Sequence, residues 1–165
     1  MDSLDDITIE RADPGDADVR PLIAAHMAHS FESAPQSSNH AMDIQALKGS
    51  GIRFWTLSDS TGVLGCGALK PLPDGTAEVK SVHIVQAARG RGLARRLMMH
   101  LIETAHRKGT RALVLETGSM EDYKPARGLY TALGFTCCDP IPGYAPDPNS
   151  VFLRLALDPA ERSPQ

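Results

Sequence analysis

The sequence is poor in the residue patterns that define several protein classes. It contains three cysteines among 165 residues, and no two of them are spaced as C-x-x-C. A structural zinc site therefore has no cysteine framework, and we expect no metal. An odd, low number of cysteines is typical of chains kept in a reducing compartment, which predicts a cytoplasmic protein.

Long apolar runs and an excess of positive charge are missing as well. No run approaches the roughly 18 apolar residues of a membrane span, and residues 1–12 lack the charged-then-apolar pattern of a secretory signal. The net charge is −3, which does not favour nucleic acid or an anionic membrane as a partner. No repeat or low-complexity linker divides the chain, so we expect a single domain over residues 1–165.

The spacing of apolar residues predicts an alternation of strands and helices. Strands are expected over residues 7–11, 52–58, 63–69, 77–85, 112–115, 135–138 and 151–157, and helices over 14–30, 40–48, 92–108 and 125–134. The three strands between residues 52 and 85 are joined by short turns, which favours an antiparallel meander. The strand, helix and strand around residues 92–108 predict a parallel crossover in a mixed sheet with helices on both faces.

The most informative segment runs from Val82 to Ala94, where a strand leads through an arginine- and glycine-rich loop into a helix. Gly90 and Gly92 allow the backbone to turn tightly and to approach a ligand closely. The first amide groups of a helix have no partners within it, and together with the helix dipole they favour an anion at that end. Four arginines crowd this helix start: Arg89, Arg91, Arg95 and Arg96.

The loop allows two interpretations. Arginine–glycine pairs at a strand–helix junction can be ordinary turn chemistry with solvated charges. Four cations at the start of a helix, however, normally destabilise it. A bound polyanion would reverse this effect for the cations near enough to contact it. The loop has neither the G-x-x-x-x-G-K-[ST] pattern nor the three-glycine dinucleotide pattern, which makes ATP, GTP and NAD less favoured ligands.

Two motifs in this order resemble the GNAT acyltransferases. Residues 89–94, Arg-Gly-Arg-Gly-Leu-Ala, match the R-x-x-G-x-[GA] loop of that family, and residues 126–135 resemble its A-x-x-L-Y-x-x-x-G-F helix. The likeness extends from about Trp55 to the final strand. The stretches at 116–119 and 147–152 are similar to a bacterial subgroup of uncharacterised acetyltransferases.

The resemblance implies a fold, a co-substrate and a set of contacts. The fold is α/β, a GNAT-like, mostly antiparallel mixed sheet of about seven strands with helices on both faces. The co-substrate is acetyl-CoA, whose pyrophosphate is held by the loop amides and whose pantetheine arm pairs with the preceding strand in a gap between neighbouring strands. The residues implied to bind it are Val82, His83, Ile84, Arg89, Gly90, Arg91, Gly92, Leu93, Ala94, Arg95 and Tyr130.

The catalytic roles are only partly indicated. By resemblance, Tyr130 is the acid that protonates the leaving thiolate of CoA; a tyrosine in the helix core is the alternative. Glu116 at the end of a buried strand, His83 beside the expected thioester and Glu78 are three options for a general base. Each of these three could equally be structural, with water relaying the proton.

The sequence thus predicts an N-acetyltransferase that moves an acetyl group from acetyl-CoA to a primary amine of a small molecule or protein, by direct attack in a ternary complex. A non-catalytic CoA-binding sensor on the same fold is the main alternative, and a phosphoryl-ligand enzyme is a second. No pattern identifies the acceptor, which depends on the first helices and on residues 33–39 and 144–149. The oligomeric state stays open, with a homodimer as one option.

Overall fold

A seven-stranded sheet forms the framework of the protein. The computed structural model describes residues 6–25 and 51–157. The strands are β1 (Thr8–Arg11), β2 (Arg53–Asp59), β3 (Gly62–Pro71), β4 (Ala77–Ile84), β5 (Ala112–Gly118), β6 (Thr136–Cys137) and β7 (Ser150–Ala156). Their order across the sheet is β1-β2-β3-β4-β5-β7-β6. The predicted mostly antiparallel mixed sheet is confirmed, because among the neighbouring strands of the described residues only β4 and β5 run parallel.

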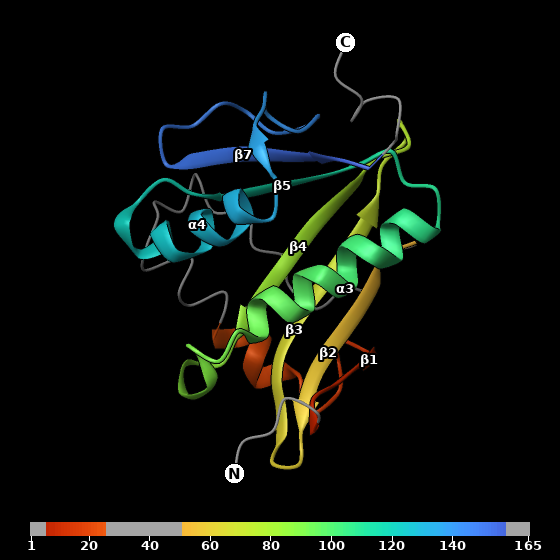
Figure 1. Cartoon of the computed structure of the whole chain (residues 1–165), viewed down its shortest axis with the longest axis vertical. Helices are drawn as coiled ribbons and strands as arrows, with labels where there is room; N and C mark the ends of the chain where they lie inside the picture. The colour runs from red at the N-terminus through yellow and green to blue at the C-terminus, as the bar shows by residue number, and fades with distance from the viewer. Residues whose placement is uncertain (1–5, 26–50, 158–165) are drawn as a thin grey trace.

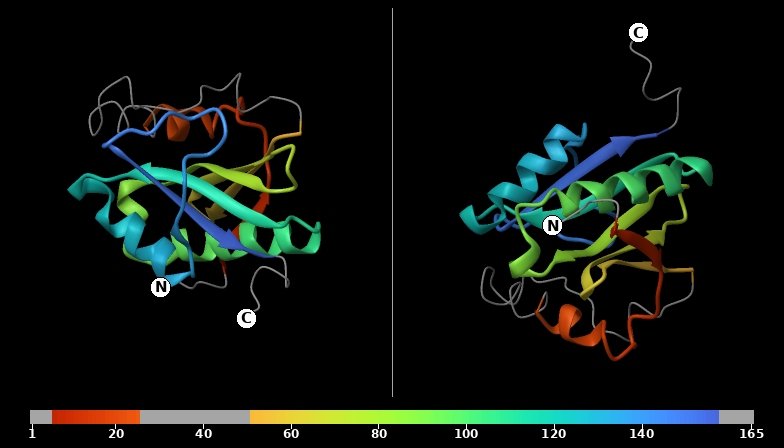
Figure 2. Two further views of the ribbon diagram at one scale, coloured as in Figure 1. Left: turned by 90° about the horizontal axis from the view of Figure 1, so that it is seen from above. Right: turned by 60° about the horizontal axis from the view of Figure 1, so that its bottom comes forward.

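Helices cover both faces of this sheet, as Figure 2 shows. On one face lie α3 (Leu93–Arg107) and α4 (Lys124–Ala132), and residues 20–25 form a helical segment on the other. Two short 3₁₀ helices, η3 (Gln86–Ala88) and η4 (Glu121–Tyr123), precede α3 and α4 and were not predicted. Each is a single turn, too short to produce a helical repeat in the sequence.

The first predicted helix begins later than expected. Residues 14–19 form turns, and helix starts at Arg20 rather than at Pro14. The Asp13 side chain accepts a hydrogen bond of 2.7 Å from the Gly15 amide, a local bond that competes with helix formation. The rest of this helix beyond residue 25, and the helix predicted over residues 40–48, lie outside the described residues.

Apolar residues of α3 hold the central strands from one side. Leu97, Met98 and Leu101 are fully buried, and the last two belong to a cluster with residues of β2–β5, α4 and β7. On the opposite face, a second cluster joins residues 19–23 to β2 and β3. The sheet is thereby fixed between two layers, which sets the direction in which each strand side chain points.

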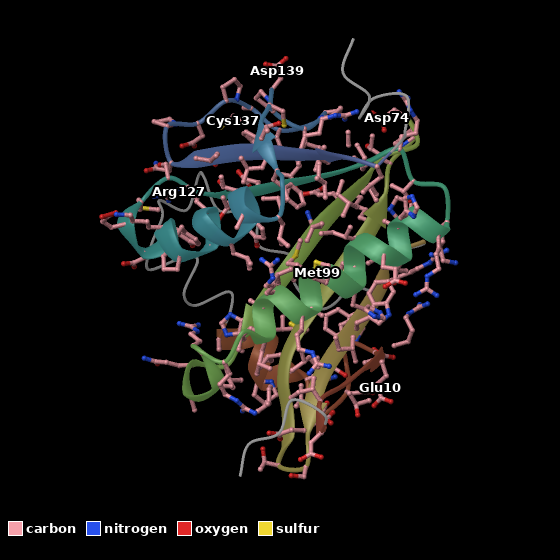
Figure 3. The ribbon with its side chains drawn as sticks, viewed as in Figure 1. Glu10, Asp74, Met99, Arg127, Cys137 and Asp139 are labelled. Carbon is pink, nitrogen blue, oxygen red and sulfur yellow. The ribbon has the colours of Figure 1, made fainter. Side chains whose placement is uncertain are left out.

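Truncating a buried side chain of α3 should loosen this framework. Leu101→Ala removes a side chain with 0% exposure, and we expect a loss of about 3 kcal/mol in the free energy of unfolding. Met99→Ala is the matched control, because Met99 is 50% exposed on the outer side of the same helix (Figure 3). Urea unfolding of both variants measures the difference; equal midpoints would contradict the packing described here.

Candidate functional site

The strands β4 and β5 pair over only a short distance and then part. Their parallel pairing covers Ala77 with Leu113 and Glu78 with Val114, whereas β5 and β7 pair along seven positions from Ala112 to Gly118. Figure 1 shows the two strands meeting at one end and opening toward α4 and the N-terminal end of α3. Beyond Glu78, the edge of β4 that faces β5 is therefore not paired with that strand among the described residues, which leaves room for a ligand to pair with it.

An irregularity in β4 accompanies this parting. Ser81 has a φ of 57°, in the left-handed region, and the pairing of β4 with β3 shifts register between Cys66 and Ala68. The Cys66 thiol lies 3.3 Å from the Ser81 carbonyl oxygen, to which it donates. Such a bulge bends a strand and increases its twist, so β4 turns away from β5 where the gap opens.

The glycine-rich loop ends at the start of α3, at the open end of the gap. Gly90 and Gly92 have φ values of 84° and 75°, and Gly92 is the N-cap of α3. A Cβ on either glycine would meet no heavy atom within 4 Å, so their conformation, rather than crowding, favours glycine. The amides of residues 90–95 donate to no backbone carbonyl among the residues that the structure describes. The N-terminal end of α3 thus presents several backbone amides that a bound anion could accept hydrogen bonds from.

Arg89 and Arg91, in the loop that precedes α3, both have protein partners. The Arg89 Nε donates to the Ile84 carbonyl oxygen at 3.0 Å, which ties the loop to the end of β4. Arg91 lies 3.8 Å from the Asp59 carboxylate in the β2–β3 hairpin. Hydrogen bonds from the hydroxyl and amide of Thr61 hold the pKa of Asp59 below its usual range. Part of the positive charge predicted from sequence is therefore balanced within the protein.

A polar cluster occupies the sheet face opposite α3, on both sides of the gap. Glu78 and Lys80 alternate along β4 with residues that pack toward α3, and Glu116 alternates with Leu115 along β5. The Glu78 carboxylate accepts from Lys80 Nζ at 3.1 Å. The Glu116 carboxylate accepts from the Ser150 hydroxyl at 2.6 Å.

His83 lies on this same face. Its neighbours Val82 and Ile84 pack in a cluster with Leu93 and Leu97 of α3, so the alternation of β4 directs His83 to the other side. His83 is 9% exposed and pairs in register with Cys66. The structure thus brings His83 and Glu116 to one face of the sheet, on two strands that diverge.

Comparison with known proteins agrees with this geometry. The model of the acetyltransferase (GNAT) family matches residues 20–135. The chain belongs to the GNAT family. It is 38% identical over 136 residues to the uncharacterized N-acetyltransferase YsnE of Bacillus subtilis, covering 82% of this chain and 90% of that protein. It is 35% identical over 155 residues to an IAA acetyltransferase of Azospirillum brasilense, covering 93% and 100% respectively.

A solved structure shares both fold and sequence with this GNAT protein. The crystal structure of a candidate acyl-CoA N-acyltransferase from Klebsiella pneumoniae matches with a TM-score of 0.75 and 31% identity, covering 92% of this chain and 97% of that one. The protein is accordingly an acetyl-CoA-dependent acyltransferase.

No helix in residues 6–25 and 51–157 is long and apolar enough to cross a membrane.

Tyr130 lies on the α3 side of the sheet. It sits in α4, 8% exposed, within the cluster that includes Leu115 of β5, and its ring centroid is 5.7 Å from that of Phe135. Burial raises the pKa of Tyr130 to about 12, so the phenol keeps its proton at neutral pH. The proton donor predicted from sequence therefore lies on one face of the sheet, and the three base candidates Glu116, His83 and Glu78 lie on the other.

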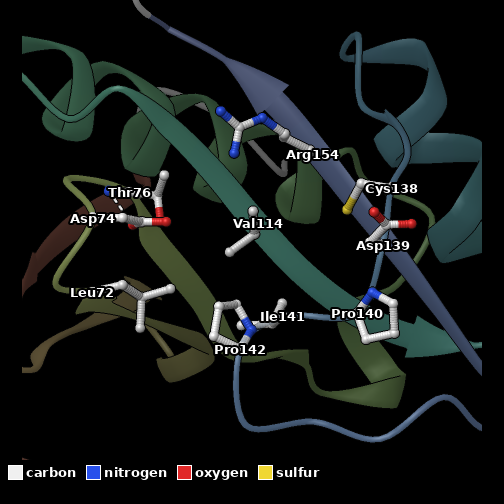
Figure 4. Close-up of a pocket in the computed structure, with 10 residues that line it drawn as sticks. All are labelled: Leu72, Asp74, Thr76, Val114, Cys138, Asp139, Pro140, Ile141, Pro142 and Arg154. Atoms are coloured by element: carbon white, nitrogen blue, oxygen red, sulfur yellow. Dashed lines mark hydrogen bonds between the residues drawn. The ribbon is translucent and has the colours of Figure 1, made fainter.

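A hollow of about 240 Å³ lies beside the polar cluster, on the same face. Figure 4 shows Val114 at its centre, with Arg154 on one side and the hydrogen-bonded pair Asp74 and Thr76 on another. Val114 is paired with Glu78, so the hollow covers the closed end of the β4–β5 pair.

In residues 6–25 and 51–157, no group of three metal-ligating side chains occurs.

Sequence patterns indicated no role for Lys80, and they placed Tyr144 only within residues 144–149, one of the segments on which the acceptor depends. The Tyr144 hydroxyl lies within hydrogen-bond distance of both Lys80 and Glu78, although 64 residues separate Tyr144 from Lys80. The alternation Glu78-Val79-Lys80 in a strand could have placed the two charges on one face. No local pattern could have brought Tyr144 to them, because that contact depends on how the segment between β6 and β7 folds back.

Proposed function

We propose that the protein transfers the acetyl group of acetyl-CoA to a primary amine of a small molecule or a protein, by direct attack in a ternary complex. The observation that carries this proposal is the parting of β4 and β5. It leaves an opening between a donor-rich helix start and a polar face that could receive an amine. We infer that the reaction takes place in the cytoplasm, as the low cysteine number suggests.

Acetyl-CoA would lie along the parted strands. The amides of residues 90–95 and the positive end of the α3 dipole would hold its pyrophosphate. The edge of β4 at Val82 to Ile84, which is not paired with β5, would pair with the pantetheine amides. The thioester would then reach the gap, with Tyr130 on one side of the sheet and the polar cluster on the other.

The reaction needs one proton acceptor and one proton donor. The neutral amine nitrogen attacks the thioester carbon, the carbon–sulfur bond breaks, and the acetyl group ends on nitrogen. A base takes the surplus proton of the amine, and Tyr130 gives its proton to the CoA sulfur. The proton acceptor and the proton donor are different groups on opposite sides of the thioester, so neither group has to serve in both proton transfers.

Glu116 is the base that this geometry favours. It lies two residues past Val114, the last position of β5 paired with β4, so its carboxylate is placed where the gap begins. The hydrogen bond from Ser150 orients the carboxylate. His83 lies farther along β4, at register with Cys66 of β3, and would serve as a binding group beside the thioester.

Glu116→Gln keeps the shape of the side chain and removes its capacity to take up a proton. We expect kcat to fall by about a hundredfold, in the usual range for a general base, with KM for acetyl-CoA unchanged. Steady-state rates of CoA release measure both constants. Glu103→Gln, on the exposed side of α3, is the matched control. An equal or larger fall in kcat for His83→Gln would contradict the choice of Glu116.

Direct transfer is favoured over an acetyl-enzyme intermediate by the state of the cysteines. Burial raises the pKa of the Cys66 thiol to about 12, and burial is also the largest cause that raises the pKa of Cys138. Cys137 is exposed on β6, beyond β7 from the gap. A thiolate nucleophile in the gap is therefore disfavoured.

Initial rates measured against both substrates test this order of events. With an accepted amine and acetyl-CoA varied together, direct transfer gives intersecting double-reciprocal lines. Parallel lines, together with acetylated protein in the absence of amine, are the signature of a covalent intermediate and would overturn the ternary-complex proposal.

A further inference from the structure

One group of side chains on the amine side of the sheet has no role in the steps described above. Lys80 Nζ lies 2.9 Å from the Tyr144 hydroxyl, and that hydroxyl lies 2.5 Å from Glu78 Oε2. The Lys80 ammonium also stands 5.6 Å from the centre of the Tyr144 ring. With the Lys80–Glu78 ion pair, each member of this triad contacts the other two.

The triad is buried and electrically compensated. The side chains of Lys80 and Glu78 are 8% and 5% exposed. A buried ion pair is costly to form, and removing one partner leaves an uncompensated charge. The phenol offsets part of that cost, because it accepts from the ammonium and donates to the carboxylate. Burial, followed by the hydrogen bond to Glu78, raises the pKa of Tyr144, so the phenol remains a donor.

A tight turn presents Tyr144 to the two charges. The Tyr144 amide donates to the Ile141 carbonyl oxygen at 2.9 Å, and Gly143 has a φ of 95°. Proline at the second position and a positive φ at the third are features of a type II turn. The Tyr144 ring also packs against Phe152 of β7, with centroids 5.8 Å apart.

The same turn borders the hollow on this face. Ile141 and Pro142 line the hollow (Figure 4), while Tyr144 reaches the ion pair on β4. Ile141, at the other end of the turn, is 3% exposed and packs with Val114 and Phe152. The turn is therefore anchored at one end by apolar burial and at the other by the triad.

We propose that Tyr144 is a positioning residue for the amine acceptor: by joining Lys80 and Glu78 of β4 to the segment between β6 and β7, it fixes the wall against which the acceptor is seated. The left view of Figure 2 shows this segment on the same side of the sheet as the helical residues 20–25. The wall spans β4, β5 and β7, beside Glu116. This assignment rests on the proposed acetyl transfer and adds the group that fixes the acceptor's place.

The chain's three tyrosines allow a matched experiment. Tyr144→Phe keeps the ring against Phe152 and removes only the hydroxyl, so the variant should fold. We expect its KM for the amine to rise about tenfold or more, the scale of a hydrogen bond to a charged group, with kcat and the Kd for acetyl-CoA unchanged. Tyr123→Phe removes a phenol oxygen from η4 and should leave all three constants unchanged.

Hydrogen exchange of the full chain gives a second readout that does not depend on turnover. Tyr144→Phe should speed amide exchange in residues 141–150 and leave residues 93–107 unchanged, because only the former are joined to β4 through the triad.

Each outcome decides between the proposals. A rise in KM confined to the amine, with faster exchange at 141–150, supports the positioning role. A fall in kcat without a change in amine KM, an unchanged exchange pattern, or an equal loss of acetyl-CoA affinity overturns it. A wild-type protein that acetylates no amine overturns the proposed function and this role with it. Transfer by the wild type with an unaltered amine KM in Tyr144→Phe overturns this role alone.

Discussion

Gly92→Asp will weaken the binding of acetyl-CoA about a hundredfold or more, a loss on the order of 3 kcal/mol. Gly92 is the N-cap of α3 with a φ of 75°, at the centre of the amides that would hold the pyrophosphate. A carboxylate placed there repels the phosphates and competes with them for the same amide donors. Titration calorimetry with acetyl-CoA measures the change.

The matched control is Gly92→Asn, which has nearly the same shape and tolerance of a left-handed backbone but no charge. Nothing lies within 4 Å of a Cβ at this position, so neither variant should crowd its neighbours. The aspartate should lower affinity far more than the asparagine, while the melting temperatures of the two unliganded proteins stay close. Equal affinities for acetyl-CoA in Gly92→Asp and the wild type would remove the loop from the binding site.

Tyr130→Phe will lower kcat by about a hundredfold to ten-thousandfold, the usual contribution of a general acid. The phenol is the buried donor on the α3 side of the sheet, and its pKa of about 12 keeps it protonated over the whole range in which the protein can be assayed. Because the ring stays in the cluster with Phe135, KM for acetyl-CoA should change little. Steady-state rates measured from pH 6 to 9, about three to six units below that pKa, test the prediction.

The same raised pKa gives a second check on Tyr130. A group that loses its proton near pH 12 cannot cause a fall in rate below about pH 10, so any alkaline limb in that range must come from another group and must persist in Tyr130→Phe. Unaltered kcat in this variant would exclude Tyr130 from the chemistry. Tyr123→Phe should again resemble the wild type.

Local sequence patterns predicted the framework well because the relevant signals are short. The apolar run at residues 112–115 marked β5, although the strand extends to Gly118 because pairing with β7 continues through Glu116 and Thr117. Leu97, Met98 and Leu101 marked the buried side of α3. Gly92 and Gly109, which flank α3, both adopt positive φ, and such positions favour glycine strongly enough to be read from sequence.

The features that make the site specific depend on contacts between distant segments. The parting of β4 from β5 follows from a bulge at Ser81, a polar residue whose type gives no sign of its backbone conformation. The ion pair of Lys80 and Glu78 is completed by Tyr144, whose approach depends on the turn at Pro142 and Gly143. A single sequence shows that turn but not the strand against which it folds.

The most direct test of the account is amine-dependent release of free CoA thiol from acetyl-CoA, measured across a panel of primary amines with the acetylated product identified by mass spectrometry. The account predicts that thiol release requires both the protein and an amine, and that each CoA released is matched by one N-acetylated product. Tight binding of acetyl-CoA with no amine-dependent release from any member of the panel would contradict it, and would favour a CoA sensor on the same fold.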